Sequence, residues 1–332
     1  MKILLTGGTG FVGRHIAWRL AAEGCEVVFS GRSQDAADEV LRHAPAAMRF
    51  LSIEHGTPQA RAALAEAARG ADALVHCAAL SAPWGSAEAF QRANVASTEE
   101  VIHACRTHGV ERLVHLSTPS LYFDFQDRLG VRESDPLPPP VNRYAQTKGM
   151  AEVLLRKADV AQTVVLRPRA VFGPWDATLM PRMLRVMRRG AIPLMRGGRA
   201  ELDLTYIDNL VDAVWLGLTQ PLPRRYNLYN VSNAEPIRLD HLLERVATAF
   251  ALPLRTRRLP WPLVSGVARL LETGAHLRNG EEPLLTRYSA GVLAFSQTLD
   301  TSAIRRELGW RPTIDLEEGI RRHAAWWLER NQ

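Results

Sequence analysis

Residues 3–13 read ILLTGGTGFVG, and this stretch decides the fold. The apolar run at 3–5 predicts a strand, and the helical spacing of apolar residues over 11–22 predicts a helix. Glycines every third residue separate the two. They allow a tight turn and close backbone approach, and the helix start offers free N–H groups to a pyrophosphate. The pattern predicts a dinucleotide-binding turn rather than a purely structural one, with contacts from Gly7, Gly10, Phe11, Val12 and Gly13.

Strand and helix signals alternate through the first half of the chain. Short apolar runs separated by helical patterns are typical of a parallel sheet that is covered on both faces. We therefore predict an α/β fold, with a Rossmann-type doubly wound parallel sheet over residues 1–167 and contributions from later segments around 201–231. The predicted strands are 3–5, 26–29, 73–77, 112–116 and 164–166, and the predicted helices are 11–22, 59–69 and 98–108.

The second half is denser in proline and arginine, and its elements are shorter. We predict that residues 168–332 form mostly a smaller C-terminal α/β domain that binds the substrate. Asp208 is expected to cap a helix over 208–219. The other predicted elements are a strand at 226–231 and helices at 177–190, 239–250, 301–308 and 315–330.

Two apolar stretches of this half, 259–271 and 284–295, allow three interpretations. They fit the core of the smaller domain, which is the interpretation we favour. They also fit one wall of a substrate cleft. A surface that faces a membrane or a partner is the third alternative.

The composition is that of an ordinary globular chain. Of 332 residues, 46% are apolar and 23% are charged, and 41 basic residues against 35 acidic ones give a net charge of +6. The basic charge is almost all arginine and is scattered, which disfavours a nucleic-acid footprint. Three cysteines without CxxC spacing and ten histidines without HExxH spacing predict free thiols and no metal site.

The N-terminus lacks the long apolar core of a signal peptide. No run of about 18 consecutive apolar residues, the usual sign of a membrane-spanning helix, is present. We therefore expect the cytoplasm, no stable membrane span, and a small molecule as the substrate.

The end of the second strand bears on the choice of cofactor. An acidic residue here usually accepts a hydrogen bond from the ribose 2′-hydroxyl of NAD, whereas arginine accommodates the 2′-phosphate of NADP. The segment at 28–33 reads VFSGRS, without an acid at Ser30. We predict that Arg32 forms a cationic cup with Ser30 and Ser33, which favours NADP, with NAD still possible. Asp35 is assigned to the next helix, and Arg32 as an ordinary surface residue is the alternative.

Tyr144 and Lys148 form a YxxxK pattern, and residues four apart share one face of a helix. An ammonium beside a phenol favours the phenolate and lowers the pKa of the phenol, which can then exchange a proton with a carbonyl oxygen. The alternative is an exposed helix pair. The hydroxyl-rich stretch 116–122 (LSTPSLY) follows a predicted strand, where open α/β sheets bind ligands, although a simple turn also fits it.

In this order, the motifs resemble the extended short-chain dehydrogenase/reductase superfamily, which includes the NAD-dependent epimerases and dehydratases. The resemblance covers nearly the whole chain. It is greatest to the branch of 3β-hydroxysteroid dehydrogenases and 2-alkyl-3-oxoalkanoate reductases. The supporting segments are 79–86 (ALSAPWGS), 117–120 (STPS), 166–174 (LRPRAVFGP) and 283–288 (PLLTRY).

The resemblance implies roles for single residues. Tyr144 would be the acid/base, and Lys148 would lower its pKa and hold the nicotinamide ribose. Thr118 would be the catalytic hydroxyl, with Ser117 beside it, and Asn94 would help to order a proton-relay water. Further cofactor contacts are implied at Ala78, Ala79 and Pro168.

Two departures from the family pattern are present. The stretch after the third strand, 51–55 (LSIEH), lacks an aspartate that often touches adenine. Pro119 and Ser120 replace the Asp-Glu pair that dehydratases carry after the catalytic hydroxyl, so elimination lacks its acid and base.

The expected function is therefore that of an NAD(P)-dependent oxidoreductase that interconverts a ketone and a secondary alcohol. The favoured substrate is an apolar 3-oxo compound, either 3-oxoacyl or sterol-like. A sugar-nucleotide 4-epimerase or reductase and a non-catalytic cofactor sensor are the alternatives. The resemblance also implies a homodimer, which would form through helices within 87–108 and 143–157.

Overall fold

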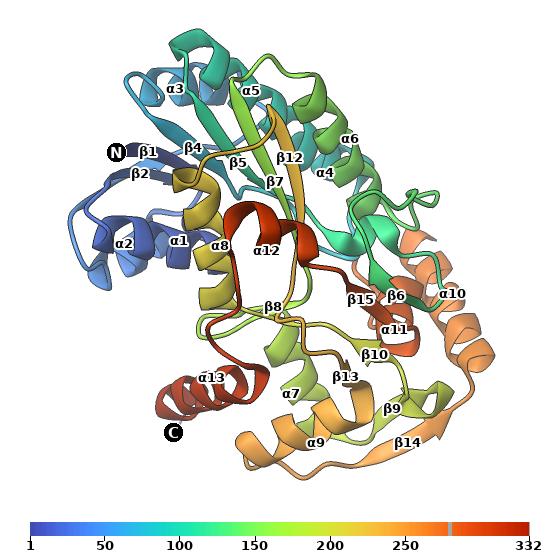
Figure 1. Cartoon of the computed structure of the whole chain (residues 1–332). Coiled ribbons are helices and arrows are strands. Elements are labelled where there is room, and N and C mark those ends of the chain that lie inside the picture. The colour runs from blue at the N-terminus through green and yellow to red at the C-terminus, as the bar shows by residue number, and fades with distance from the viewer. Residues whose placement is uncertain (278–280, 332) are drawn as a thin grey trace.

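The first strand belongs to a seven-stranded sheet in which every neighbouring pair is parallel (Figure 1). The computed structural model describes residues 1–277 and 281–331. The strand order is β12-β7-β5-β4-β1-β2-β3, so the chain changes direction across the sheet beside β1, where such folds bind ligands. The strands are β1 (Lys2–Thr6), β2 (Glu26–Gly31), β3 (Met48–Ser52), β4 (Ala73–His76), β5 (Arg112–Leu116), β7 (Gln162–Pro168) and β12 (Tyr226–Val231).

Both faces of this sheet are buried. Successive strand residues point to opposite faces, so neighbouring residues of one strand pack in different cores. Ile3 and Leu5 of β1 pack in one apolar core with helices α1 (Phe11–Ala22) and α8 (Ile207–Thr219). Leu4 packs in a second core on the other face. Two helices contribute to this second core, α3 (Pro58–Ala67) and α5 (Ser97–His108). The predicted doubly wound Rossmann-type fold is thereby confirmed.

Further helices connect the strands of this part. Figure 1 shows α6 beside α4 and α5. A π-helical turn, Gln91–Ala96, lies between α4 and α5 and contains Asn94. The remaining elements here are α2 (Gln34–Arg42), α4 (Ala87–Phe90), α6 (Arg143–Lys157) and a short 3₁₀ turn, Pro119–Tyr122.

A smaller group of elements lies at one side of the large sheet (Figure 1). Its main sheet has the order β13-β10-β15-β6, with β13 (Ile237–Arg238), β10 (Glu201–Leu202), β15 (Gln297–Leu299) and β6 (Arg128–Val131). The other strands are β8 (Val171–Phe172) with β11 (Thr205–Tyr206), and β9 (Ile192–Met195) with β14 (Thr256–Leu259). The helices are α7 (Leu179–Arg189), α9 (Leu239–Ala249), α10 (Trp261–Leu277), α11 (Arg287–Ala294), α12 (Ser302–Leu308) and α13 (Leu316–Asn331), with a 3₁₀ turn at Arg196–Gly198.

The chain crosses between the two groups more often than the predicted boundary at residue 167 implies. β12 and α8 both follow residue 167, and they pack with the large sheet. β6 comes from the first half of the chain, yet it pairs with β15 in the smaller sheet.

The structure corrects the prediction that Asp208 caps a helix. The N-cap of α8 is Tyr206, whose backbone is extended, and no side chain caps this end. Asp208 lies one step inside the helix, in its first turn. A carboxylate there still interacts favourably with the partial positive charge of the helix start.

The apolar stretches 259–271 and 284–295 belong only in part to the core of the smaller domain, which was the favoured interpretation. Val264 and Ala268 are buried, but Leu263, Val267 and Leu270 form an exposed stripe along α10. Leu284, before α11, is 99% exposed. No helix in the described ranges is both long and apolar enough to cross a membrane.

Candidate active site

The glycine turn between β1 and α1 brings backbone close to backbone. Gly7 has a φ of +73°, and a Cβ there would lie 2.7 Å from the Ala78 backbone nitrogen at the end of β4. A Cβ at Gly13 would lie 2.1 Å from the carbonyl oxygen of Gly7. The N-cap of α1 is Gly10, and no side chain caps the helix. The residues therefore fit a dinucleotide, since the helix start offers its N–H groups to a pyrophosphate without a competing side chain.

The cup that was predicted from Arg32, Ser30 and Ser33 does not form at the end of β2. Ser30 is fully buried, and its hydroxyl has no hydrogen-bond partner among the described residues, so it does not line an open site beside Arg32. Ser33 is the N-cap of α2, and its Oγ accepts a hydrogen bond from Ala36 at 3.2 Å. Arg32 is exposed. Asp35 lies in the first turn of α2, as expected.

Tyr144 is near the N-terminus of α6, and its phenol is hydrogen-bonded by two hydroxyl groups, those of Ser81 and Thr118. Burial raises the pKa of the Tyr144 phenol above its ordinary value, and the two hydrogen bonds act in the opposite direction. Thr118 is the second residue after the end of β5, and its side chain is buried. The structure thus brings the predicted phenol and the predicted hydroxyl together at the carboxyl edge of the large sheet.

Lys148 does not act on this phenol as the sequence predicted. Its Nζ lies 2.7 Å from the carbonyl oxygen of Leu116 and 3.0 Å from Nε2 of His115, both on β5. Burial lowers the pKa of Lys148 to about 8. The expected lowering of the Tyr144 pKa is therefore wrong for this structure, in which the ammonium is directed toward β5 and burial dominates at the phenol.

Ser117, the neighbour of Thr118, faces a different group. Its Oγ donates to Glu152 at 2.5 Å, and the Glu152 carboxylate also binds the Arg167 guanidinium at 2.5 Å. Arg167 in turn donates to the hydroxyl of Tyr122 at 2.5 Å. The geometry therefore distinguishes the two candidate hydroxyls: Thr118 is directed to Tyr144, and Ser117 belongs to a buried ion-pair network.

Asn94 is buried, and its side chain bridges two segments. Its Oδ1 accepts from the backbone of Leu80 at 2.7 Å, and its Nδ2 donates to Thr147 at 3.0 Å. The side chain thus fastens the loop after β4 to α6, beside Lys148. The implied role in ordering a relay water stays a prediction.

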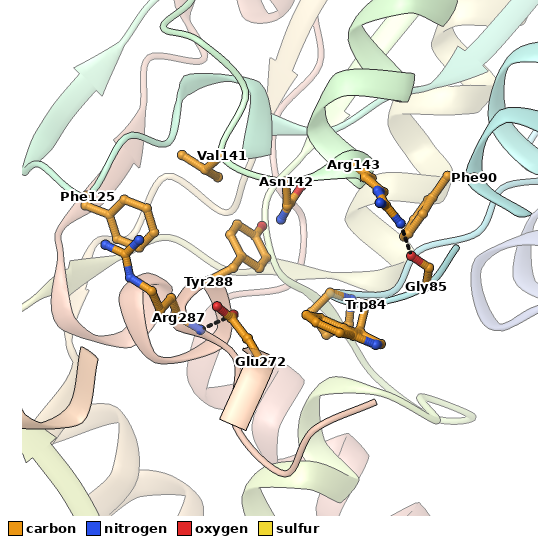
Figure 2. A pocket seen from close by; sticks show the side chains of 11 residues that line it. Trp84, Gly85, Phe90, Phe125, Val141, Asn142, Arg143, Glu272, Arg287 and Tyr288 are labelled. Carbon is orange, nitrogen blue, oxygen red and sulfur yellow. Dashed lines mark hydrogen bonds between the residues drawn. The ribbon is translucent and has the colours of Figure 1, made fainter. Parts of the chain in front are cut away.

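A pocket with a volume of about 220 Å³ lies next to these groups. Figure 2 shows Tyr288 near its middle, with Phe125 on one side and Trp84 on the other. Tyr288 connects the pocket to the phenol, because its Oη lies 2.5 Å from Ser120 Oγ, and Ser120 accepts from Thr118 at 2.9 Å. The other lining residues are Pro83, Gly85, Phe90, Val141, Asn142, Arg143, Glu272 and Arg287.

Several of these site residues could not be found from the sequence by chemistry alone. Ser81, His115 and Tyr288 come from segments far from α6. Ser81 and Tyr288 lie in segments that support the family resemblance, 79–86 and 283–288, but no spacing or residue type singles them out. Glu152 did have a signal: it follows Tyr144 and Lys148 at the same four-residue spacing on one helix. Pro168 is half-buried at the end of β7, and Ala79 is exposed after β4. Within the described residues, no cluster of three His, Cys, Asp or Glu side chains that could hold a metal is found.

Comparison with known proteins identifies the family. Residues 3–231 match the model described as "NAD dependent epimerase/dehydratase family". A 2-alkyl-3-oxoalkanoate reductase of Stenotrophomonas maltophilia is 33% identical over 98% of this chain and 99% of its own length. A second, from Shewanella oneidensis, is 32% identical over 97% of this chain and 85% of its own.

Solved structures agree on the fold. UDP-glucose 4-epimerase of Thermotoga maritima superposes with a TM-score of 0.77 over 100% of both chains, at 18% identity. At that identity the likeness concerns the fold alone. The match to the family model and the reductases confirms the resemblance inferred from the motifs. The chain belongs to the NAD dependent epimerase/dehydratase family, within the short-chain dehydrogenase/reductase superfamily, and is an oxidoreductase of that superfamily.

Proposed function

We propose that this protein interconverts the ketone of an apolar 3-oxo compound, 3-oxoacyl or sterol-like, and the corresponding secondary alcohol. The observation that carries the proposal is the hydrogen-bonded pair of Tyr144 and Thr118, which lies at the carboxyl edge of the sheet. The relatives named 2-alkyl-3-oxoalkanoate reductase support this substrate class. Pro83, Trp84 and Phe125 give the adjoining pocket an apolar wall.

The chain's own residues supply the proton in this reaction. A bound nicotinamide cofactor provides the hydride that reduces the carbonyl carbon. Tyr144 gives its proton to the carbonyl oxygen of the substrate. The Thr118 hydroxyl, which donates to Ser120 in this structure, would turn to donate to the same oxygen. Because burial raises the pKa of Tyr144, the phenol is protonated at neutral pH and ready to donate. A hydrogen bond from Ser81 then stabilises the phenolate that remains.

Tyr144→Phe tests this assignment, because it removes only the hydroxyl group. We expect turnover to fall by about 10²- to 10⁴-fold, the usual contribution of a positioned acid, while cofactor binding measured by fluorescence stays unchanged. The substrates offered are 3-oxoacyl compounds, sterols and UDP-sugars. Full activity of the variant would contradict the role of Tyr144, and turnover of UDP-glucose without added cofactor would favour an epimerase instead.

NADP is the proposed cofactor. Arg32 is exposed at the end of β2, no acidic residue occupies that strand end, and Ser33 lies beside it. A guanidinium there accommodates a 2′-phosphate, and a hydrogen bond to a charged group contributes about 1.5–3 kcal/mol. Arg32→Ala should therefore weaken NADPH binding about 10- to 100-fold and leave NADH binding unchanged. Equal affinity of the wild type for both cofactors would contradict the proposal.

A homodimer is the proposed assembly. A groove with a volume of about 520 Å³ runs along α6 and the loop before it, and its lining is mostly apolar. Three of its side chains, Leu137, Met150 and Val153, are exposed. Exposed apolar side chains that line one groove are typical of a surface that a partner covers. The groove lies on the helices through which the family resemblance implies that two copies pair.

The cytoplasm is the proposed compartment. All three cysteines, Cys25, Cys77 and Cys105, are free. Burial raises the pKa of the Cys77 and Cys105 thiols to about 12, so both stay protonated and unreactive. Free thiols of this kind are typical of proteins in a reducing compartment.

A further inference from the structure

Arg169 follows the last residue of β7, at the carboxyl edge of the large sheet. Its backbone is fixed on both sides: its N–H donates to Val231 at 3.0 Å, and its carbonyl oxygen accepts from Thr205 at 2.7 Å. The residue is only 9% exposed. Its Nε is enclosed and has no hydrogen-bond partner among the residues that the structure describes. The backbone of Arg169 is therefore fixed at the sheet edge, while its buried guanidinium keeps an unsatisfied donor.

Other buried arginines of this protein are paired. Arg167 binds Glu152 and Tyr122, and Arg14 binds Glu39 at 3.1 Å. Across residues 1–277 and 281–331, the Arg169 side chain has no hydrogen bond and no ion pair. A buried charge without a partner is costly, so such a group is kept where a ligand completes it.

The nearest carboxylate influence comes from Asp203, which is also buried. This carboxylate already accepts from Ser232 at 3.1 Å and from the Leu299 backbone at 2.7 Å. It forms no ion pair with Arg169 within the described structure. Asp203 thus offsets part of the field of the guanidinium, but it does not occupy its N–H donors.

Arg169 and Thr118 follow β7 and β5, which are neighbouring strands paired at Leu166 and Leu116, so both residues lie at the same part of the sheet edge. The charge of Arg169 lowers the pKa of the Tyr288 phenol against the opposite effect of burial. Tyr288 is bonded to Ser120, and Ser120 to Thr118, which reaches Tyr144. A line of hydroxyl groups thus leads from the proposed acid to the neighbourhood of Arg169. A substrate whose ketone contacts Tyr144 would bring groups near that ketone toward this guanidinium.

We propose that Arg169 binds a carboxylate of the substrate and selects 3-oxo or 3-hydroxy acids over their neutral esters. This inference rests on the proposed function. A guanidinium presents N–H donors in a planar fork that matches a carboxylate. One unpartnered cation suits a single negative charge better than a diphosphate, and Arg287, the other arginine beside Tyr288, is already bonded to Ser265 at 3.1 Å and lies over the Phe125 ring.

The oxidation direction gives a stable pair of test substrates, 3-hydroxydecanoate and its methyl ester. We expect the wild type to prefer the acid. Arg169→Gln should lower kcat/KM for the acid by about 10- to 100-fold, the loss of a charge-assisted hydrogen bond, and should change that for the ester by less than about threefold. Arg169→Lys keeps the charge but loses the fork, and should fall between the two. Arg258→Gln, which removes an exposed arginine of β14, is the matched control.

Thermal unfolding without substrate gives a readout that does not depend on turnover. If Arg169 is unpaired until a ligand binds, Arg169→Gln removes an unpaired buried charge. The Tm of this variant should then equal or exceed that of the wild type. Added 3-hydroxydecanoate should raise the Tm of the wild type and not that of the variant.

The outcomes separate this inference from the proposed function. Equal losses on acid and ester, a lower Tm of Arg169→Gln, or a variant that no longer folds would each overturn the role of Arg169 and leave the reductase proposal in place. If the wild type oxidises neither compound and acts on a UDP-sugar instead, the proposed function itself is wrong.

Discussion

Single residues at the carboxyl edge of the sheet are held at a cost to stability. Lys148 and Arg169 are both buried, and within the described ranges neither forms an ion pair with a carboxylate. Lys148 is instead bonded to a carbonyl oxygen and to an imidazole. Arrangements of this kind are common at functional sites, where stability is lost in exchange for activity.

Lys148 makes this cost measurable through pH. Burial lowers its pKa from the ordinary 10.5 to about 8. Between these pH values the unfolded chain retains a proton that the folded protein has lost, so stability rises with pH across the window. Below pH 8, both states hold the proton, and the cost of burying the ammonium is fully present. Each pH unit is worth about 1.4 kcal/mol, so about 3 kcal/mol is recovered by pH 10.5.

Urea unfolding of the wild type and of Lys148→Met checks this at several pH values from about 7 to 10.5. The lost hydrogen bonds to His115 and Leu116 change the stability of the variant by an amount that does not depend strongly on pH. We expect the free energy of unfolding of the wild type to increase relative to that of Lys148→Met as the pH rises. A constant difference would mean that Lys148 keeps an ordinary pKa in the fold.

At the scale of elements, α6 organises the site. Tyr144, Lys148 and Glu152 follow one another at four-residue spacing, and each contacts a different part of the sheet edge. The phenol binds Thr118 after β5, the ammonium binds the end of β5 itself, and the carboxylate binds Arg167 of β7. One helix thereby fixes two neighbouring strand ends with three side chains.

The Glu152–Arg167 pair should therefore carry much of the stability of this contact. Both side chains are almost completely buried. Arg167→Met leaves the Glu152 carboxylate uncompensated, and such a loss typically costs about 3–5 kcal/mol. The double variant Arg167→Met/Glu152→Leu removes both charges and should recover most of that loss, measured as the free energy of unfolding in urea.

An exposed pair provides the control for this experiment. Arg69 and Glu66 lie at 2.8 Å with most of both side chains in solvent. Water screens such a pair, so Arg69→Met should leave the unfolding free energy unchanged within error. If the double variant is no more stable than Arg167→Met, the buried carboxylate is not the source of the loss.

The elements also differ in how far the sequence predicts them. The helix over 11–22 and the strands over 112–116 and 226–231 have the predicted bounds, because each shows one clear periodicity that polar residues end. The smaller sheet is different. β10 has only two residues, which are too few to show a period. β6 and β15 are far apart in the sequence: the hydrogen-bonded Gly130 and Thr298 are 168 positions apart.

The same reasoning applies to the site. Spacing along one helix predicts Tyr144 and Lys148, and position after a strand predicts Thr118. Whether a side chain has a partner depends on contacts between distant segments, so the missing partner of Arg169 and the direction of Lys148 are properties of the folded chain alone. Ser30 shows where prediction from the sequence ends. Its position at a strand end was predicted correctly, but its burial could not be predicted from the residue type.

At the scale of the whole molecule, two apolar surfaces compete for the role of interface. One is the groove along α6, with Met150 and Val153 exposed. The other is the stripe on α10, where Leu270 is 76% exposed. The groove is concave and, in the proposed homodimer, would receive side chains from a second copy, whereas the stripe is a row of side chains on one helix. Concave apolar surfaces permit the close packing that a stable homodimer needs.

Matched substitutions decide between these surfaces. Val153→Glu places a carboxylate in the groove, and burying it without a partner costs several kcal/mol. Since about 1.4 kcal/mol is tenfold in affinity, the dissociation constant of the dimer should rise by at least about 100-fold. Sedimentation at micromolar concentration should then give twice the mass of one chain for the wild type and for Leu270→Glu, and the mass of one chain for Val153→Glu. A monomeric wild type, or dissociation caused by Leu270→Glu instead, would contradict pairing through α6, and the second result would assign the interface to α10.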